Sequence, residues 1–446
     1  MNESARETQP AAAPADPADP AAGAEVMSTA NLTRAVRRRA LAFIFVTVLV
    51  DSVGFGIILP VLPQLIMQLT GVSIDRAAPY GGWLAAVYAL TQFFCAPVLG
   101  NLSDHFGRRP VILLALFALG CDYLIMGSAP VISWLFVGRI IAGVAGASFT
   151  PAYAYVADVT EPEKRAQSFG LMGAAFGLGF IIGPAIGGFL GALGPRAPFF
   201  TAGAIALANT LFGYFALPES LPPSARRPFQ WARANPLGTV RQIRQYPVVT
   251  WMIGALFLWQ LGHQVLPTTW AFYTISKFNW TPRQVGLSLA WVGLVMAIAQ
   301  GALTRVLIPW LGGERRAALL GMAAAVCAYL GYAFATQGWM IYVVSLATFM
   351  FALSYPSMNS LASRNTPANA QGELQGAVAS SYSLSSILGP PLMTGVFGYF
   401  SSPAAPVHFP GAAFVTAALL TLASAALLLR ALRLAAGHGS AARGEA

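Results

Sequence analysis

The sequence has 446 residues, of which 56% are hydrophobic and only 9% are charged, with a mean hydropathy of +0.62. Soluble domains carry about 25% charged residues, so this composition excludes a soluble protein and is typical of a chain that crosses a membrane many times. The net charge of +10 lies mostly between apolar stretches, which favours a topological explanation over nucleic-acid binding. Cys95, Cys121 and Cys327 lie far apart in apolar stretches, which predicts neither a metal site nor a disulfide framework.

Twelve segments have the length and apolarity of membrane spans, which need about 20 mostly apolar residues. They cover residues 40–69, 81–101, 110–128, 132–154, 167–191, 198–217, 247–272, 285–308, 316–335, 338–360, 374–399 and 408–430. An even number of spans places both ends of the chain on the same side of the membrane.

The segments outside these spans divide the chain. Residues 1–39 are rich in Ala, Pro and Asp and have no early apolar core, so we expect a disordered tail and no signal peptide. A second tail is expected at residues 431–446. The Pro- and Arg-rich residues 218–246 predict a linker between a first half, residues 40–217, and a second half, residues 247–430.

Basic residues are distributed unequally between the two sides. They gather before the first span, after even-numbered spans and at the end of the chain, whereas only Arg76, Arg196, Lys277 and Arg283 fall on the opposite side. Because cytoplasmic loops of membrane proteins carry an excess of Lys and Arg, both termini are predicted to be cytoplasmic.

The two halves resemble each other in sequence. Gly183-Pro184 recurs as Gly389-Pro390, a shift of 389 − 183 = 206 residues, and Pro60 recurs as Pro267, a shift of 207. A nearly constant shift over half the chain indicates internal duplication. Duplicated halves with binding sites at their interface are a common architecture of secondary transporters.

A short polar segment separates the second and third spans. It reads Gly100-Asn-Leu-Ser-Asp104-His-Phe-Gly107-Arg108-Arg109. The glycines permit a tight turn and close helix approach. Asp104 lies where an acid could face the N-terminus of another helix, whose dipole favours negative charge. The alternative is a basic loop that only determines topology.

Three charged residues are predicted at similar depth near the middle of the membrane. At 1.5 Å per residue, Asp51 lies about 16 Å along the first span, Asp122 about 18 Å along the third, and Arg139 about 22 Å from the inner end of the fourth. Burial disfavours the charged form of an acid and a nearby arginine favours it. This balance suits proton coupling; the alternative is a permanently ionised pair that holds helices together, or an arginine that extends outward to water.

The fifth span is rich in glycine and contains one proline. The residues at issue are Gly179, Gly183, Pro184, Gly187 and Gly188. Proline removes a backbone hydrogen bond, and glycines let the helix bend and pack closely. The alternative is an ordinary kinked helix without a role in transport.

The second half has no acid or arginine near mid-span, but it has aromatic and amide side chains. Such a lining suits amphipathic organic molecules that bind by apolar contact with a few polar anchors. We expect substrate contacts from Trp259, Gln260, His263, Trp291, Gln300 and Tyr382, and from Tyr88, Gln92 and Phe176 in the first half. Alternatively, His263 is only a hydrogen-bonded helix residue.

Taken together, residues 40–430 resemble the drug:proton antiporters of the major facilitator superfamily, specifically the tetracycline-efflux-like group. The polar loop resembles the signature G-x-L-x-D-x-x-G-R-R/K, and the fifth span resembles the antiporter signature G-x-x-x-G-P-x-x-G-G. Group-specific stretches are Asp51-Ser-Val-Gly-Phe-Gly-Ile-Ile-Leu-Pro-Val-Leu-Pro63, Cys121-Asp-Tyr-Leu124 and Gln371-Gly-Glu-Leu-Gln-Gly376. The resemblance implies that Asp104 meets the N-terminus of span eleven near residues 372–374, and that Arg108 pairs with Asp158.

The chain departs from this group at several positions. His105 replaces the usual basic residue of the loop, and in the second-half copy Arg305 stands where the acid is expected. Met296 and Ala325 stand where the best-known tetracycline pumps carry a histidine and an aspartate tied to proton coupling and to the metal–tetracycline substrate. These departures argue against tetracycline itself and move coupling to the first half.

The sequence therefore predicts an all-α integral membrane protein with twelve transmembrane helices in two pseudo-symmetric six-helix halves. We expect a monomeric bacterial inner-membrane exporter that exchanges protons for small amphipathic molecules by alternating access, without cofactor, metal or nucleic-acid partner. The alternatives are a proton-coupled metabolite symporter, which the antiporter signature disfavours, and a non-transporting membrane sensor or enzyme, for which the expected catalytic groups are missing.

Overall fold

The structure, a computed structural model, describes residues 34–230 and 246–444, and within these residues it is helical with no strand. The first half contains α2 (Arg34–Ile58), α3 (Leu62–Thr70), α4 (Ile74–Phe106), α5 (Arg108–Gly127), α6 (Ile132–Gly146), α7 (Phe149–Val159), α8 (Arg165–Leu190) and α9 (Ala197–Ala216). Pro60 lies in the break between α2 and α3, as expected for a residue that cannot donate a backbone hydrogen bond.

The second half contains α11 (Pro247–His263), α12 (Val265–Phe278), α13 (Pro282–Ile298), α14 (Thr304–Trp310), α15 (Glu314–Phe334), α16 (Gly338–Ser345), α17 (Thr348–Phe351), α18 (Ser354–Arg364), α19 (Gln371–Ser401) and α20 (Ala412–Gly444). Several of these are consecutive pieces of one rod, such as α11 with α12 and α16 with α17 and α18. A π-helical turn, Ala299–Leu303, joins α13 to α14.

The predicted all-helical membrane class is confirmed, but the span count is confirmed only in part. Ten helices of the described residues are long and apolar enough to cross a membrane. The predicted seventh span, which the structure divides at Gln264 into α11 and α12, is not among these ten. The predicted eleventh span, α19, has 31 residues, but its many Ser, Gly and Gln residues lower its hydropathy.

Helices extend into both predicted tails where the structure describes them. α2 begins at Arg34, inside the expected tail 1–39, and residues 1–33 lie outside the described part. α20 continues to Gly444, past the predicted end of the last span at residue 430. The residues after Arg430 are rich in Ala and Leu, which favour helix. Of the expected linker, residues 231–245 lie outside the described part.

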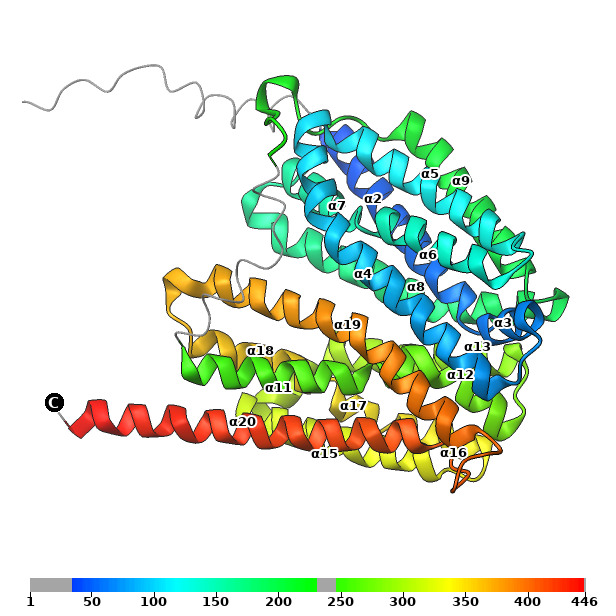
Figure 1. The fold of residues 1–446 in the computed structure, drawn as a ribbon. Helices are drawn as coiled ribbons and strands as arrows, with labels where there is room; N and C mark the ends of the chain where they lie inside the picture. Colours follow the sequence, from blue (N-terminus) through cyan, green and yellow to red (C-terminus); the bar gives the residue numbers. More distant parts are fainter. Residues whose placement is uncertain (1–33, 231–245, 445–446) are drawn as a thin grey trace, which may run out of the picture.

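The two halves form separate bundles that meet along two pairs of long helices. Figure 1 shows the first half above the second, with α4 beside α19 and the two bundles diverging toward the end at which α20 terminates. α4 packs against α19, and α8 packs against α13. We call the end where α2 begins and α20 ends the terminal face, and the other end the opposite face.

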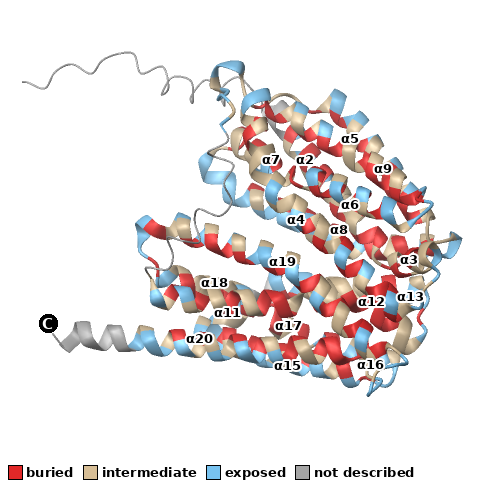
Figure 2. Ribbon diagram, in the orientation of Figure 1, coloured by how far each residue is buried: buried red, intermediate tan, exposed pale blue. Residues whose placement is uncertain are grey.

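Contacts between the halves concentrate near the opposite face. Gly398 of α19 packs against Pro79 of α4, and Gly188 of α8 packs against Pro282 at the start of α13. Toward the terminal face, Phe94 on α4 and Tyr382 on α19 are instead exposed, by 54% and 59%. Buried residues therefore line each bundle's interior and the opposite-face junction, whereas α4 and α19 carry exposed residues where the bundles diverge (Figure 2).

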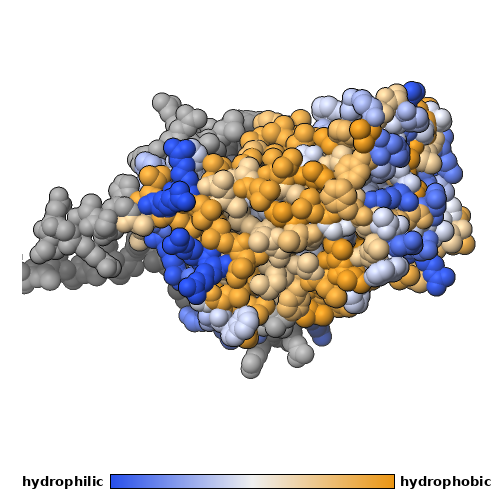
Figure 3. Space-filling model, turned by 90° about the horizontal axis from the view of Figure 1, so that it is seen from below, coloured by the Kyte–Doolittle hydropathy of each residue, from blue (hydrophilic) through white to orange (hydrophobic). Residues whose placement is uncertain are grey.

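The outer surface has the polarity expected of a membrane protein. Figure 3, a view of the second-half side, shows a broad apolar belt between two hydrophilic edges. Large apolar side chains are exposed on this kind of surface, including Trp339, Leu419 and Leu422. Since each of these would be costly in water, the belt is the surface that faces lipid.

Candidate functional site

The polar loop between α4 and α5 is built around Arg108. Its guanidinium lies 2.5 Å from Asp104 Oδ1 and 3.2 Å from Asp158 Oδ2, and it donates to Ser103 Oγ at 2.6 Å. The turn reverses at Gly107, whose φ of 106° is strained for any residue with a side chain. The structure thus brings together Asp104, Arg108 and Asp158 from α4, α5 and α7.

The N-terminus of α19 does not take part in this cluster in the described structure. No hydrogen bond or ion pair joins Asp104 to residues 371–374 among the residues described. Because the halves are in contact near the opposite face and diverge at the terminal face, the structure represents the state in which this expected contact would be open.

The sequence analysis did not identify Glu219, whose carboxylate binds the backbone of the loop at the start of α5. This acid follows α9, and its carboxylate accepts hydrogen bonds from the backbone N–H groups of Arg108 at 2.9 Å and Arg109 at 3.2 Å. It also accepts from the N–H groups of Ser220 and Leu221, both at 3.0 Å. A negative charge at the start of α5 is stabilised by the helix dipole. A lone acid directly after an apolar span was the available signal.

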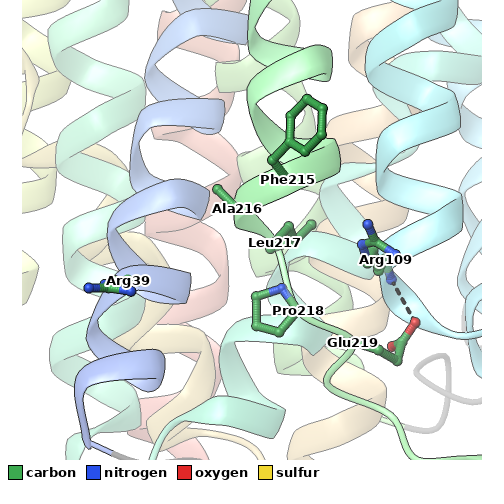
Figure 4. A pocket seen from close by; sticks show the side chains of 7 residues that line it. All are labelled: Arg39, Arg109, Phe215, Ala216, Leu217, Pro218 and Glu219. Carbon is green, nitrogen blue, oxygen red and sulfur yellow. Dashed lines mark hydrogen bonds between the residues drawn. The ribbon is translucent and has the colours of Figure 1, made fainter.

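The residues after Glu219 continue across the same loop. Ser220 Oγ donates to Asp158 Oδ2 at 3.0 Å, the Arg227 N–H donates to the Asp104 carbonyl at 3.1 Å, and Asn101 Nδ2 donates to the Gln230 carbonyl at 2.6 Å. Beside them lies a pocket of about 350 Å³ (Figure 4), lined by Arg39, Arg109, Phe215, Ala216, Leu217, Pro218 and Glu219. The start of the linker is therefore part of the terminal-face structure of the first half.

Deeper in the first half, Asp122 and Arg139 face each other across α5 and α6. Asp122 is fully buried, and its Oδ2 lies 3.8 Å from Arg139 Nη2. Arg139 Nη2 also lies 2.8 Å from the sulfur of Met126. Neither carboxylate oxygen of Asp122, nor Arg139 Nε, has a hydrogen-bond partner in the described structure. The pair is therefore close but incompletely satisfied.

Asp51 lies on α2 in the same region of the first half. Its Oδ1 is buried and has no hydrogen-bond partner among the described residues. Tyr88 on α4 connects the elements. Its ring lies 6.0 Å from the Arg139 guanidinium and 6.2 Å from the ring of Phe55 on α2, and its hydroxyl accepts from Gln92 Nε2 at 3.3 Å. Four helices thus contribute to one buried polar region.

The glycines of α8 fit against two neighbouring helices. A Cβ on Gly183 would lie 2.6 Å from the Val53 carbonyl of α2, and one on Gly188 would lie 2.7 Å from the Pro282 carbonyl of α13. Gly179 and Gly187 also contact α2 too closely for a side chain. Pro184 lies inside this helix and packs near Gly56. The glycines of α8 therefore let this helix pack closely both against α2, which carries Asp51, and against α13 of the second half.

The expected second-half residues divide into two groups. Trp259 stacks on His263, Phe351 and Tyr355, with ring centroids 5.3, 5.3 and 5.9 Å apart. Gln260 contacts Ser385 Oγ at 3.5 Å. The second group, described next, consists of residues that do not take part in this aromatic stack.

Tyr382 on α19 is exposed, as is Phe176 on α8 of the first half, and Gln300 is exposed in the π-helical turn. Trp291 instead donates to Ser345 Oγ at 2.7 Å, so it ties α13 to α16. Met296 and Ala325 add no charge, and no cluster of three metal-ligating side chains occurs within the described residues. Ala325 is fully packed, with 1% exposure.

Comparisons with known proteins agree with this architecture. Residues 44–390 match the Major Facilitator Superfamily family model. The chain is 41% identical over 363 residues to the class C tetracycline resistance protein of Escherichia coli, covering 81% of this chain and 91% of that protein. It is 33% identical over 355 residues to the class B protein of Escherichia coli, covering 79% and 87%.

Solved structures give the same result. The human organic anion transporter MFSD10 (TETRAN) is 25% identical, with a TM-score of 0.63 over 88% of this chain and 99% of that one. The nucleoside transporter NupG shares the fold alone, at 12% identity and a TM-score of 0.69 over 88% and 99% of the chains. The chain belongs to the Major Facilitator Superfamily and, within it, groups with the tetracycline resistance proteins.

Proposed function

We propose that this protein is a proton-coupled exporter of small amphipathic organic molecules, of the drug-efflux kind, which works by alternating access. It is a multi-pass membrane protein of a transporter family. We further propose that it acts as a monomer in the bacterial inner membrane, with the terminal face cytoplasmic. The asymmetric distribution of arginines and the named bacterial relatives support these assignments.

The buried polar region of the first half carries the proposal. Ionisable residues inside a membrane protein are costly and commonly functional. Asp51 and Asp122 each have buried oxygens without a hydrogen-bond partner, and Arg139 lies beside Asp122. Acids held in this way can accept and release protons, while the exposed aromatic side chains between the halves suit an apolar substrate.

The substrate class is drawn from the relatives and the lining together. Tetracycline is the first molecule to test, since the curated relatives are tetracycline resistance proteins. Met296 and Ala325 nevertheless stand where the resemblance leads us to expect a histidine and an aspartate. We therefore expect broader amphipathic substrates, and a weaker dependence on divalent metal than the best-known tetracycline pumps.

Transport in inside-out membrane vesicles tests the proposal. With an acidic lumen, the vesicles should accumulate tetracycline or ethidium, and a protonophore should abolish the accumulation. A growth-inhibition panel in a pump-deficient host would identify the preferred substrates. Accumulation driven by an alkaline lumen would instead identify a symporter, and no transport of any panel compound would favour the sensor or enzyme alternative.

A further inference from the structure

The pocket beside Glu219 lies at the level where three helices reach the edge of the membrane. The apolar span of α2 begins at Arg39, that of α5 begins at Arg108, and that of α9 ends at Ala216. Arg39, Arg109 and Ala216 all line this pocket of about 350 Å³. Its volume lies within the range of about 300–1,000 Å³ that is typical of small-molecule sites. The pocket is therefore a cavity at the boundary between the membrane spans and the terminal face.

Two arginines give this pocket a positive charge. Arg39 of α2 and Arg109 of α5 lie on either side of the chain segment that follows α9 (Figure 4). Arg39 is exposed, and neither arginine forms an ion pair among the described residues. The one acid of the lining, Glu219, already accepts hydrogen bonds from four backbone N–H groups. Two guanidinium groups and one carboxylate leave the lining with a net positive charge.

Arg109 is held in place without losing its charge. Its Nη2 donates to the Tyr214 carbonyl at 2.5 Å, and its guanidinium lies 5.4 Å from the centre of the Tyr214 ring. Its Nε is buried and has no hydrogen-bond partner in the described structure. Because a guanidinium has five N–H donors in a planar fork that matches a phosphate group, Arg109 keeps donors for an anion in the pocket.

The pocket adjoins an apolar stripe on α9. Phe215 lines the pocket and is 78% exposed, and Leu211, four residues earlier on the same helix face, is 62% exposed. Large apolar side chains that are exposed on a membrane-spanning chain face the acyl chains of lipids. A phospholipid needs both features, a basic site for its phosphate and an apolar surface for its acyl chains.

The second half has only part of this arrangement. The shift of 207 residues between the halves places Arg316 at the position of Arg109, since 109 + 207 = 316, but Tyr246 at the position of Arg39, since 39 + 207 = 246. Arg316 is exposed at the start of α15, on the same face of the molecule. The second arginine at this level is therefore a feature of the first half, and Arg316 offers a matched control.

We propose that this pocket binds the headgroup of an anionic phospholipid such as phosphatidylglycerol. Arg39 and Arg109 lie on either side of the lipid phosphate, and Phe215 contacts an acyl chain. A free phosphate ion has the same charge, but it gains nothing from the apolar stripe, so the lipid is the assigned ligand. Basic pockets between transmembrane helices are known sites for anionic headgroups. The inference does not depend on the proposed transport function.

Native mass spectrometry of the purified protein, titrated with phosphatidylglycerol or phosphatidylcholine, tests the proposal. The parent should bind its first phosphatidylglycerol more tightly than its first phosphatidylcholine. Arg39→Gln and Arg109→Gln should each weaken the first phosphatidylglycerol about fivefold, the effect of one basic residue beside an anionic lipid. Arg39→Lys, which keeps the charge, and Arg316→Gln, the matched control, should stay within about twofold of the parent.

Three outcomes would overturn the inference. Equal binding of the two lipids by the parent would show that the pocket does not select an anionic headgroup. An equal loss in Arg316→Gln would show that only the overall surface charge matters. Displacement of phosphatidylglycerol by inorganic phosphate would identify a site for free anions. Arg39→Gln decides the matter even if Arg109→Gln, which loses the bond to the Tyr214 carbonyl, does not fold, because Arg39 is exposed.

Discussion

Asp122 and Arg139 lie 3.8 Å apart between α5 and α6, yet Asp122 is completely buried and neither of its oxygens receives a hydrogen bond in the described structure. Gly138 makes this approach possible, because any side chain there would collide with the carboxylate. Helix packing therefore holds the two side chains close together, but the Asp122 carboxylate lacks hydrogen bonds. A buried ion pair without such hydrogen bonds contributes little to stability, which argues against a purely structural role.

Removing either member of this pair should be damaging. Asp122→Asn or Arg139→Gln leaves the other charge uncompensated in a medium of low dielectric constant, at a cost of several kcal/mol. The double variant should lose less than the sum of the single losses in both thermal stability and transport. Strictly additive losses would show that the two side chains do not interact.

Asp51→Asn should abolish pH-gradient-driven export while the protein still inserts in the membrane. Asp51 has a buried oxygen without a partner, and asparagine keeps its shape but cannot take up a proton. Transport in vesicles with an imposed pH gradient measures the loss. The amount of the variant protein in the membranes of the same vesicles controls for insertion. Full gradient-driven transport by this variant would contradict a coupling role.

The loop between α4 and α5 should control the conformational equilibrium. Asp104 bonds Arg108 in this structure, and in the closed terminal face it should also meet the N-terminus of α19, a helix-dipole interaction of about 0.3–1 kcal/mol. Asp104→Asn should therefore slow turnover but leave substrate binding near normal. Cysteine labelling at a position facing the terminal-face opening should become faster.

Arg315 and Arg316 provide the matched comparison for this prediction. Both are exposed at the start of α15, in the corresponding loop of the second half, where the acid is missing. Arg315→Ala and Arg316→Ala should have much smaller effects than Asp104→Asn. Equal labelling, or effects as large in the second-half variants, would mean that the loop only determines topology.

Glu219→Ala should destabilise the first half from its terminal face. The carboxylate accepts backbone hydrogen bonds from Arg108 and Arg109, which satisfies donors that the start of α5 otherwise leaves unpaired. Loss of a helix cap costs about 0.5–2 kcal/mol, so the unfolding temperature in detergent should fall. Glu163→Ala, at an exposed acid before α8, is the control and should leave it unchanged.

Small side chains at the junction of the halves should control closure of the opposite face. A Cβ on Gly82 would overlap Thr394 and Pro390 of α19, and one on Gly286 would overlap the Pro184 carbonyl of α8. Overpacking of this kind costs about 1–3 kcal/mol in the closed arrangement. Gly82→Ala and Gly286→Ala should therefore shift the population toward an open opposite face.

Labelling of cysteines near the opposite face would measure this shift. Gly395→Ala is the control on α19, because a Cβ there meets nothing within 4 Å. Faster labelling is expected for the two junction variants and parental labelling for the control. The same rate in all three would show that the junction tolerates extra volume without opening.

Composition and local sequence determined the class of protein, the two-half organisation and the main motifs. Long apolar segments must be helical in lipid because every backbone polar group needs an internal partner. The loop at Asp104 and Arg108 and the glycines of α8 were likewise recognisable, since their spacing is local. The same local reasoning gave the end of the last membrane span, at residue 430, and not the end of its helix, because Ala- and Leu-rich residues continue α20 to Gly444.

Beyond the pairs that the motifs indicated, such as Arg108 with Asp158, only the tertiary structure showed which distant side chains meet. Glu219 reaches the start of α5 across 111 residues of sequence, and Tyr123 reaches α2 only because Gly54 leaves space for its hydroxyl. Apolar periodicity is weak in helices that face lipid on one side and protein on the other, so it does not identify the contacting faces. These contacts depend on the volume missing at single glycines, a property of paired helix surfaces that neither helix shows by itself.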